Sequence, residues 1–408
     1  MQLSTPHASP DLFGRFLQGL GDAANAPLGL AVSGGGDSMA MLHLAAGAGL
    51  KVRAVTVDHG LRSDAADEAA MVGRVCADMG IAHAVLQWHW NQKGNLLDQA
   101  RRARRALIGD WARQAGLSTV AVGHTEDDIA ETFLMRLARG AGVDGLAAMV
   151  PEWAGQGITW RRPLLSVSRA ELRAYLRALG VGWVDDPSND APQFERVKAR
   201  KALLALAPLG LSAARLAEVA AHLSEARAAL EIAGARAAGA VLREDQGAVL
   251  IDVVRLAAEP EDMQRRVLLR ILDSIAPTEF GPRGSSLTRI RAAVLAGRPG
   301  QLAGVRFLPG KAGARAFRDA QSVKGAVAGP TELWDGRWRL HGPWLDAMQV
   351  RALGVAGLVQ CDGWRATGRP RAELAGSPSV WLGTRLIAAP LAGFGLEWRA
   401  EPAGRWVC

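Results

Sequence analysis

The first 190 residues alternate short apolar runs with longer segments in which apolar positions recur at helical spacing. Apolar runs of roughly four to eight residues without helical periodicity are typical of buried strands. Such runs predict strands at residues 28–32, 52–57, 81–86 and 119–122. Each is followed by a predicted helix, at residues 39–48, 65–79, 96–114 and 127–139. This alternation predicts an α/β fold, in which helices cover both faces of a parallel sheet.

Beyond residue 140 the pattern loosens through a glycine-rich stretch. Residues 158–165 predict a further strand. Ser168-Arg-Ala-Glu171 has the spacing of a capping box, which predicts a helix that runs to about residue 179. Residues 185–190 are dense in turn-forming residues and predict an exposed loop.

The second half of the chain has a different pattern. Residues 212–239 are rich in Ala, Leu and Arg at helical spacing, and residues 261–275 predict another helix. From about residue 300 the chain carries many Gly, Pro and Trp residues and short strand-like runs such as residues 338–341. We therefore expect three domains: an α/β domain at 1–210, a helical region at 211–299 and an α+β or β-rich domain at 300–408.

The composition is that of a folded chain, since 49% of the 408 residues are hydrophobic and 22% are charged. The sequence begins without the pattern of a signal peptide and contains no apolar run long enough to span a bilayer. We therefore expect a cytoplasmic protein with no membrane partner. Three widely spaced cysteines, Cys76, Cys361 and Cys408, suit a reducing compartment and form no disulfide framework or zinc knuckle.

The formal net charge of +8 suggests a polyanionic partner such as a nucleic acid. Almost all of the positive charge is arginine, however, and an arginine bias can reflect genome composition as readily as function. Charge alone therefore leaves the question of a nucleic-acid partner open.

The first predicted strand ends in a glycine-rich turn, Ser33-Gly34-Gly35-Gly36-Asp37-Ser38, directly before a helix. Glycines let the backbone turn tightly and bring several N–H groups toward one point. The helix that follows adds its N-terminal N–H groups and the positive end of its dipole. With two serine hydroxyls as further donors, this turn predicts a site for a phosphate or a pyrophosphate.

Two other phosphate-binding motifs do not match this turn. No lysine follows the glycines as in G-x-x-x-x-G-K-[ST], and the spacing G-x-G-x-x-G of dinucleotide-binding folds is absent. Asp37 is the informative residue, because a carboxylate beside phosphate oxygens would repel them unless a Mg²⁺ ion lay between the two.

These residues resemble the pyrophosphate loop of the ATP pyrophosphatase (PP-loop) superfamily. Further segments, in the same order along the chain, narrow the resemblance to the tRNA(Ile)-lysidine synthase family. They are Asp58-His-Gly-Leu-Arg62, Ala100-Arg101 with Arg104, Gly123-His124-Thr-Glu-Asp127-Asp128-Ile-Ala-Glu131-Thr132, Arg139-Gly-Ala-Gly142, Gly145-Leu146, Arg162-Pro-Leu-Leu165 and Asp186-Pro-Ser-Asn189. The resemblance covers roughly the first 200 residues. Two positions depart from the family pattern: Val197 stands where Asn is more frequent, and Arg105 where Tyr is frequent.

The resemblance implies a reaction. The family joins the ε-amine of free L-lysine to C2 of the wobble cytidine in an isoleucine tRNA with a CAU anticodon. ATP first adenylates the C2 oxygen, and the products are lysidine, AMP and pyrophosphate. The implied partners are therefore ATP, Mg²⁺, L-lysine and tRNA(Ile), and the terminal domain at 300–408 is expected to bind the tRNA. The oligomeric state stays open, a homodimer included.

The resemblance also implies roles for particular residues. Ser33 to Ser38 would hold the pyrophosphate, and Asp37 with Asp128 would hold Mg²⁺. His124 would contact the α-phosphate or the developing adenylate. Arg101 and Arg104, three positions apart on a predicted helix, could direct two guanidinium groups at phosphates.

Structural interpretations stand beside some of these roles. Asp127 could instead cap the helix that follows it. Some of the arginines between residues 101 and 105 are expected simply to face water. The basic side chains Arg196, Lys198, Arg200 and Lys201 could bind the tRNA or be solvated.

Three alternative functions remain open. A tRNA thiolase of the same superfamily is disfavoured by the lack of paired cysteines, and a small-molecule ligase by the segments at residues 58–62 and 186–189. A non-catalytic tRNA-binding protein is disfavoured by Asp37, Asp127 and Asp128, because RNA binding alone would gain from their loss.

Overall fold

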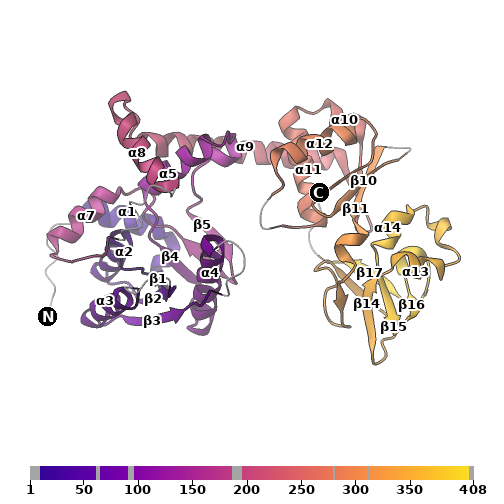
Figure 1. Cartoon of the computed structure of the whole chain (residues 1–408), viewed down its shortest axis with the longest axis horizontal. Coiled ribbons are helices and arrows are strands. Elements are labelled where there is room, and N and C mark those ends of the chain that lie inside the picture. The colour runs from indigo at the N-terminus through magenta and orange to yellow at the C-terminus, as the bar shows by residue number, and fades with distance from the viewer. Residues whose placement is uncertain are drawn as a thin grey trace. The chain divides into compact units, whose positions relative to one another are not determined.

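The computed structural model describes residues 10–60, 65–90, 96–185, 195–278, 281–310 and 313–403. The chain divides into two compact units, and the division falls between Arg227 and Ala228. Each unit has its own sheets and hydrophobic clusters (Figure 1). The predicted division into three domains stays a prediction.

A six-stranded sheet forms the centre of the N-terminal unit, with strand order β3-β2-β1-β4-β6-β5. The strands are β1 Leu28–Ala31, β2 Val52–Asp58, β3 Ala82–Gln87, β4 Thr119–Val122, β5 Glu152–Gly155 and β6 Ile158–Arg161. Neighbours pair in parallel except β5, which is antiparallel to β6. The predicted parallel sheet is thus confirmed. The strand predicted at 158–165 is too long, since β6 ends at Arg161 before Pro163, which has no N–H to donate.

Helices connect these strands. Their bounds are α1 Pro10–Leu20, α2 Gly36–Gly47, α3 Ala65–Asp78, α4 Leu96–Gln114, α5 Glu126–Leu137, α6 Val143–Leu146, α7 Arg169–Ala178 and α8 Glu195–Leu206. The predicted helices are confirmed to within a few residues at each end. The prediction did not include α1, although Leu12, Phe16 and Leu20 recur every four residues and are all buried.

The two faces of the sheet pack against different helices. In β1 successive side chains point to opposite faces, so Leu28 and Leu30 join a cluster with α1, α2 and α7, while Ala31 joins a cluster with α4. At Gly29 an added Cβ would lie 3.0 Å from the Trp111 ring of α4 and 2.9 Å from the Val120 side chain. The absence of a side chain there lets α4 pack closely on the sheet.

Capping boxes fix the first turns of two helices. At α7 the Ser168 hydroxyl accepts a hydrogen bond from the Glu171 backbone N–H, and the Glu171 carboxylate accepts from the Ser168 N–H, as predicted. At α5 the same exchange joins Thr125 and Asp128. The cap of α5 is therefore Thr125 and not Asp127, so the alternative role considered for Asp127 is wrong.

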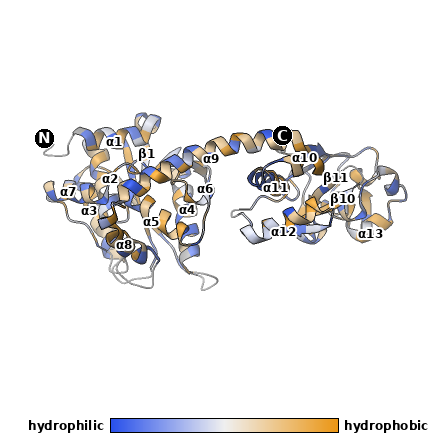
Figure 2. Cartoon of the chain, turned by 90° about the horizontal axis from the view of Figure 1, so that it is seen from above, coloured by the Kyte–Doolittle hydropathy of each residue, from blue (hydrophilic) through white to orange (hydrophobic). Residues whose placement is uncertain are grey.

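A long helix, α9 Ala213–Val241, leads from the first unit into the second and carries hydrophobic and hydrophilic residues in alternation along its length (Figure 2). It confirms the helix predicted at 212–239. Among the described residues no single helix is long and apolar enough to cross a membrane; the segments Glu195–Leu209 and Ala213–Val241 meet those criteria only when combined across a 98° bend.

The C-terminal unit contains two hydrophobic clusters with separate sheets. The first cluster surrounds a sheet of order β7-β8-β11-β10-β9, and the second surrounds a sheet of order β12-β14-β15-β16 and the pair β13-β17. The strands are β7 Leu242–Asp245, β8 Ala248–Ile251, β9 Gly300–Leu302, β10 Val305–Gly310, β11 Gly313–Arg318, β12 Val327–Ala328, β13 Trp338–His341, β14 Met348–Ala352, β15 Pro378–Leu382, β16 Arg385–Ala388 and β17 Arg399–Pro402. The helices are α10 Val253–Ala258, α11 Glu261–Ile275, α12 Gly284–Leu295, α13 Gly354–Val359 and α14 Arg371–Ala375. The predicted helix at 261–275 and the predicted strand at 338–341 are confirmed.

Partly buried ion pairs join the two clusters of the C-terminal unit. Arg315 of β11 contacts Asp245 of β7 at 2.6 Å and donates to Glu373 of α14 at 2.8 Å. Arg369 also pairs with Asp245, at 2.9 Å, and with Glu373. The first sheet includes strands on both sides of residue 300. Removal of the chain from that residue onward would therefore break both a sheet and an ion-pair network.

Candidate active site

The carboxyl ends of the parallel strands bring the predicted motifs to one edge of the sheet. The glycine-rich turn follows β1, Asp58 ends β2, Gly123 and His124 follow β4, and Arg162 follows β6. Ligands of open α/β sheets bind at this edge, where the loops from successive strands meet. The sheet topology therefore assembles residues that are up to 129 positions apart in the sequence, from Ser33 to Arg162.

The glycine-rich turn has the geometry of an anion-binding loop. Gly34 has a φ of +87°, which a residue with a side chain rarely adopts. The hydroxyl of Ser38 accepts from the Ser33 N–H at 3.1 Å and donates to the Gly35 carbonyl at 2.9 Å, which fixes the turn. Gly35 is the N-cap of α2 and has no side chain to satisfy the first N–H groups of the helix. Those groups can therefore bind an anion.

Gly123 brings the β4–α5 loop against this turn. A Cβ added at Gly123 would lie 3.2 Å from the Ser38 backbone N and 3.3 Å from the Asp37 carbonyl O. Only a glycine allows so close an approach of the two backbones. His124 is therefore held next to the predicted pyrophosphate site.

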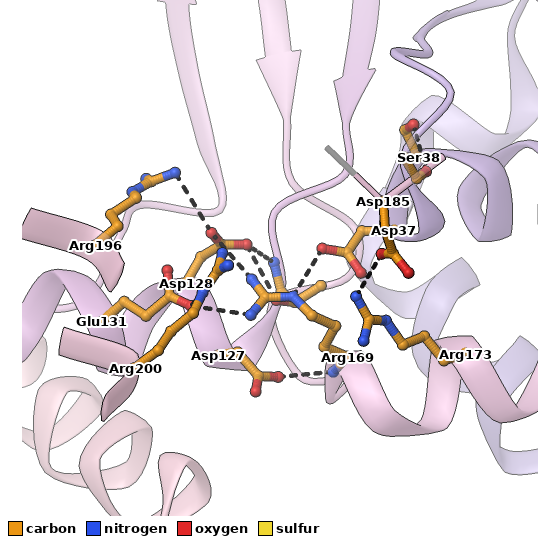
Figure 3. Close-up of polar contacts among 12 residues, drawn as sticks. Asp37, Ser38, Asp127, Asp128, Glu131, Arg169, Arg173, Asp185, Arg196 and Arg200 are labelled. Carbon is orange, nitrogen blue, oxygen red and sulfur yellow. Dashed lines mark hydrogen bonds and ion pairs between the residues drawn. The ribbon is translucent and has the colours of Figure 1, made fainter. Parts of the chain in front are cut away.

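Four carboxylates contact one arginine at this edge of the sheet (Figure 3). The guanidinium of Arg169 contacts Asp37 Oδ2 through Nε at 3.2 Å and Asp128 Oδ1 through Nη2 at 3.6 Å. It donates to Glu131 Oε1 through Nη1 at 2.9 Å. Asp127 accepts from the backbone N–H of the same residue at 2.7 Å. Asp127 therefore binds the first turn of α7 and not the start of its own helix.

The carboxylates in this cluster differ in how fully they are satisfied. Asp128 Oδ2 accepts from the N–H and the hydroxyl of Thr125, at 2.9 and 3.0 Å. Glu131 is fully buried, and its Oε1 also accepts from Arg200 Nε at 2.7 Å. Its second oxygen, Oε2, is buried without a hydrogen-bond partner among the described residues. Glu131 Oε2 is thus an acceptor in this cluster that no described residue uses.

The pKa values of Asp37 and Asp128 are shifted in opposite directions. Burial raises the pKa of Asp37, and the Arg169 charge only partly offsets this effect. For Asp128 burial also acts upward, but nearby positive groups, Arg169 among them, hold its pKa below the ordinary value. The carboxylates meanwhile raise the pKa of Arg169 against the effect of its burial, so this cation stays charged.

His124 is a neutral hydrogen-bond acceptor. Arg162 Nε donates to its Nδ1 at 3.2 Å, and the Arg162 guanidinium also lies 3.9 Å from the centre of the Trp153 ring. Burial lowers the pKa of His124 to about 4; the charge of Asp128 acts in the opposite direction, and those of Arg162 and other neighbouring arginines lower it further. Because Nδ1 accepts, the neutral ring carries its proton on Nε2, which can then donate to a phosphate oxygen.

Several arginines lie close to one another on the His124 side of the site. Burial, followed by the charge of Arg101, lowers the pKa of Arg104. Burial, followed by the charges of Arg105 and Arg101, lowers the pKa of Arg162 to about 10. Guanidinium groups that depress one another's pKa in this way are poised to bind a polyanion. The structure thus brings the predicted residues Arg101 and Arg104 close to Arg162, which the prediction did not include as a site residue.

The predicted tRNA-binding residues of α8 separate into two groups. Arg196 lies 3.8 Å from Asp128, and Arg200 binds Glu131, so both approach the acidic cluster (Figure 3). Lys198 and Lys201 are exposed. Val197, which departs from the family pattern, is buried.

Some predicted segments are only partly described. Asp58 is buried and accepts from the Gly60 N–H at 2.8 Å, and the ring of His59 meets Trp88 edge-on at 5.9 Å. Leu61, Arg62 and the segment Asp186-Pro-Ser-Asn189 lie outside the described residues. The sequence analysis did not predict Arg169 as a site residue. Two signals were available: it directly follows the helix cap Ser168, and it is a charged residue close to the motif Arg162-Pro-Leu-Leu165.

Asp37 and Asp128 differ in how well they could bind a magnesium ion. Arg169 contacts only Oδ2 of Asp37, which leaves Oδ1 as a hard oxygen ligand beside the phosphate loop. Asp128 directs one oxygen at Thr125 and the other at Arg169 and Arg196. Within the described parts of the chain, no group of three or more His, Cys, Asp or Glu side chains could hold a metal ion. A Mg²⁺ that keeps water and phosphate ligands needs only one or two carboxylates, and Asp37 meets this need.

Known proteins match the chain along most of its length. The PP-loop domain family matches residues 11–207. A protein from Ruegeria pomeroyi named tRNA(Ile)-lysidine synthase is 47% identical over 379 residues, which cover 92% of this chain and 90% of the relative. Proteins of the same name from Zymomonas mobilis and Rhizobium meliloti are 37% and 34% identical, over 72% and 83% of this chain and 89% and 78% of the relatives.

The buried position of His124 predicts an unusual titration. We expect the ring to stay neutral from pH 8 to about pH 5 and to titrate near the lowered pKa of about 4, below its ordinary 6.5. NMR of the chain labelled at histidine Cε1 would measure this, with the resonance assigned by its loss in His124→Gln. Since the unfolded chain takes up this proton first, the group should also reduce the free energy of unfolding as the pH falls from 6.5 toward 4. Half-protonation of His124 near pH 6.5 would contradict the described environment.

Proposed function

Because the chain belongs to the tRNA(Ile)-lysidine synthase family, we propose that it uses ATP to join free lysine to the wobble cytidine of isoleucine tRNA with a CAU anticodon. The observation that carries the proposal is the match to the Ruegeria pomeroyi relative over almost the entire length of both chains. The PP-loop, the neutral histidine and the arginine-rich edge of the sheet supply groups that this reaction requires.

The reaction requires activation of a poor leaving group. The C2 oxygen of cytidine attacks the α-phosphorus of ATP, and pyrophosphate departs. The ε-amine of lysine then attacks C2, and AMP departs with the oxygen. Phosphoryl chemistry of this kind depends mainly on the positioning of the reactants and on the stabilisation of negative charge.

We propose that Ser33 to Ser38 hold the pyrophosphate portion of ATP. The uncapped N–H groups at the start of α2 and the positive end of the helix dipole offset its charge. Asp37 would hold the Mg²⁺ ion that accompanies the nucleotide, and this ion would further neutralise the phosphate oxygens. Asp128, the second predicted magnesium ligand, stays a proposal that requires its contacts with Arg169 and Arg196 to open.

We propose that His124 and the arginines act on the α-phosphate. The Nε2–H of neutral His124 can donate to an oxygen of the adenylate without a change in charge. Arg101, Arg104 and Arg162 place positive charge where negative charge develops during adenylation. Preorganised donors of this kind contribute roughly 3 to 4 kcal/mol each to the stabilisation of a transition state.

The alternative functions have less support. A tRNA thiolase that works through paired cysteines would need two thiols at one site, but Cys76 and Cys361 are each buried and belong to different units. Burial raises the pKa of Cys76 to about 11, which makes it a poor nucleophile. A non-catalytic RNA-binding protein would have no use for a cluster of buried carboxylates beside a phosphate loop.

A direct assay tests the proposed function. The purified chain is incubated with ATP, Mg²⁺, lysine and unmodified tRNA(Ile) bearing CAU, and the nucleosides are digested and weighed. We expect one cytidine to gain one lysine, with stoichiometric AMP and pyrophosphate. If no lysidine forms while a positive-control enzyme succeeds, the proposed substrate is wrong. Pyrophosphate release with other acceptors would then identify the reaction.

Substitution of the loop carboxylate tests the role of Asp37. We expect Asp37→Ala to remove pyrophosphate release and to leave tRNA binding nearly intact, because we propose that this carboxylate in the first turn of α2 serves the nucleotide and not the RNA. Pyrophosphate release and tRNA filter binding measure the two effects. Asp22→Ala, a change in an acidic residue outside the site, is the matched control. Release of pyrophosphate at the wild-type rate would exclude a magnesium role for Asp37.

Charge reversal on α8 tests the proposed contact with tRNA. Lys198 and Lys201 are exposed, whereas Arg196 and Arg200 also contact carboxylates, so the lysines separate RNA binding from the integrity of the site. We expect the double variant Lys198→Glu with Lys201→Glu to weaken tRNA binding. The slope of the logarithm of the binding constant against the logarithm of the salt concentration should fall by the equivalent of about two phosphate contacts. The affinity for ATP should not change. Lys51→Glu, also at an exposed position, is the control, and equal losses for tRNA and ATP would contradict the proposal.

The remaining expectations stay proposals. The region beyond residue 300 would add to tRNA binding, and the exposed position of Arg339 and Arg399 on the pair β13-β17 supports this role. The cytoplasmic location and the oligomeric state, a homodimer included, also await experiment.

A further inference from the structure

Arg169 is the centre of the acidic cluster, although the sequence motifs do not assign it a role. Three nitrogens of its guanidinium approach three different carboxylates, those of Asp37, Asp128 and Glu131. These acids come from two helices, α2 and α5, while the arginine comes from a third, α7. A single side chain thus connects the phosphate loop to the helix that follows β4.

The shape of the arginine side chain suits this position. Its planar guanidinium directs N–H donors along fixed directions, so Nε, Nη1 and Nη2 can each serve a separate acceptor. The side chain of Arg169 is 16% exposed, and the backbone N–H of the same residue is held by Asp127 at 2.7 Å. A lysine would carry the same charge at one point and could not reach all three carboxylates in the same way.

The carboxylates need a cation in this place. Their side chains are 22%, 8% and 0% exposed for Asp37, Asp128 and Glu131, and like charges in such an environment repel one another and favour protonation. Proteins meet this need either with a guanidinium or with a divalent metal ion between the acids. Here the guanidinium fills that need, since its Nε lies 3.2 Å from Asp37 Oδ2 and its Nη2 lies 3.6 Å from Asp128 Oδ1.

We propose that Arg169 is a positioning residue that takes the place of a bridging metal ion between Asp37 and Asp128. It holds both carboxylates apart and in place before the nucleotide arrives. The divalent ion that accompanies ATP then enters on the side of Asp37, so the nucleotide-free chain has no divalent site of its own at this cluster. Entry of the ion together with ATP rests on the proposed function, whereas the exclusion of metal from the nucleotide-free chain does not.

Manganese binding by the nucleotide-free full chain tests the proposal. Free Mn²⁺ is counted by electron paramagnetic resonance, without ATP, lysine or tRNA, so the result does not depend on whether the chain makes lysidine. We expect Arg169→Met to bind Mn²⁺ on the order of tenfold more tightly than the wild type, because removal of the guanidinium exposes the acids to the metal. The gain should disappear in Arg169→Met with Asp128→Asn.

Three further variants make the outcome decisive. Arg177→Met, an exposed arginine on the same helix, should match the wild type. Arg169→Lys keeps a cation in the cluster and should still exclude Mn²⁺. Arg169→Gln is the second neutral variant, used if thermal melts show that Arg169→Met does not fold, and it should gain the same site. Equal Mn²⁺ affinity in the wild type and the neutral variants would overturn the proposal, as would a gain that persists without the Asp128 carboxylate.

Kinetics of the full reaction distinguish positioning from a general loss of structure. With Arg169→Lys we expect the turnover number to fall severalfold more than the KM for ATP rises, because the charge remains while the carboxylates lose their alignment. If the turnover number and the KM of Arg169→Lys instead changed together, in proportion to a fall in the thermal midpoint, the role of Arg169 would be structural alone. That result would contradict the proposal.

Discussion

The electrostatic balance between carboxylates and guanidinium groups at the carboxyl edge of the sheet governs the site. Asp37, Asp128 and Glu131 lose most of their hydration where α2 packs against α7 and α5 packs against α8, and such acids are stable only with cations at hydrogen-bond distance. Arg169 from α7 and Arg200 from α8 provide them. The positions of α7 and α8 are therefore stabilised by these ion pairs as well as by the burial of apolar side chains.

The same edge is divided into two electrostatic regions. Around Arg169 the acids and the guanidinium compensate each other, whereas around His124 the arginines depress one another's pKa. An adenylation site needs both regions, because a triphosphate requires uncompensated positive charge while its metal ion requires a carboxylate. Under the proposed function, the glycine-rich turn would let Asp37 serve the metal ion and the start of α2 serve the phosphates.

Local patterns in the sequence predicted much of the first unit. Apolar runs such as residues 28–32 and the capping box at Ser168 depend on neighbours only a few positions away, and the structure reproduces them. The role of Arg169 could not be predicted in this way, because its partners Asp37 and Glu131 are 132 and 38 positions distant. In the second unit the hairpin of β7 and β8 was missed although its own pairing is local, whereas the pairing of β8 with β11, which joins residues more than 60 positions apart, could not be read from neighbouring positions.

The contact between Gly123 and the phosphate loop has a mechanical consequence. Closely packed backbones at van der Waals distance cannot move independently, so a displacement of Ser38 or Asp37 must be passed to the segment that carries His124. That histidine is in turn hydrogen-bonded to Arg162, whose guanidinium rests on the Trp153 ring. Occupation of the loop by a nucleotide would thereby be transmitted across the sheet to its β5–β6 edge, and this coupling needs no hinge or moving domain.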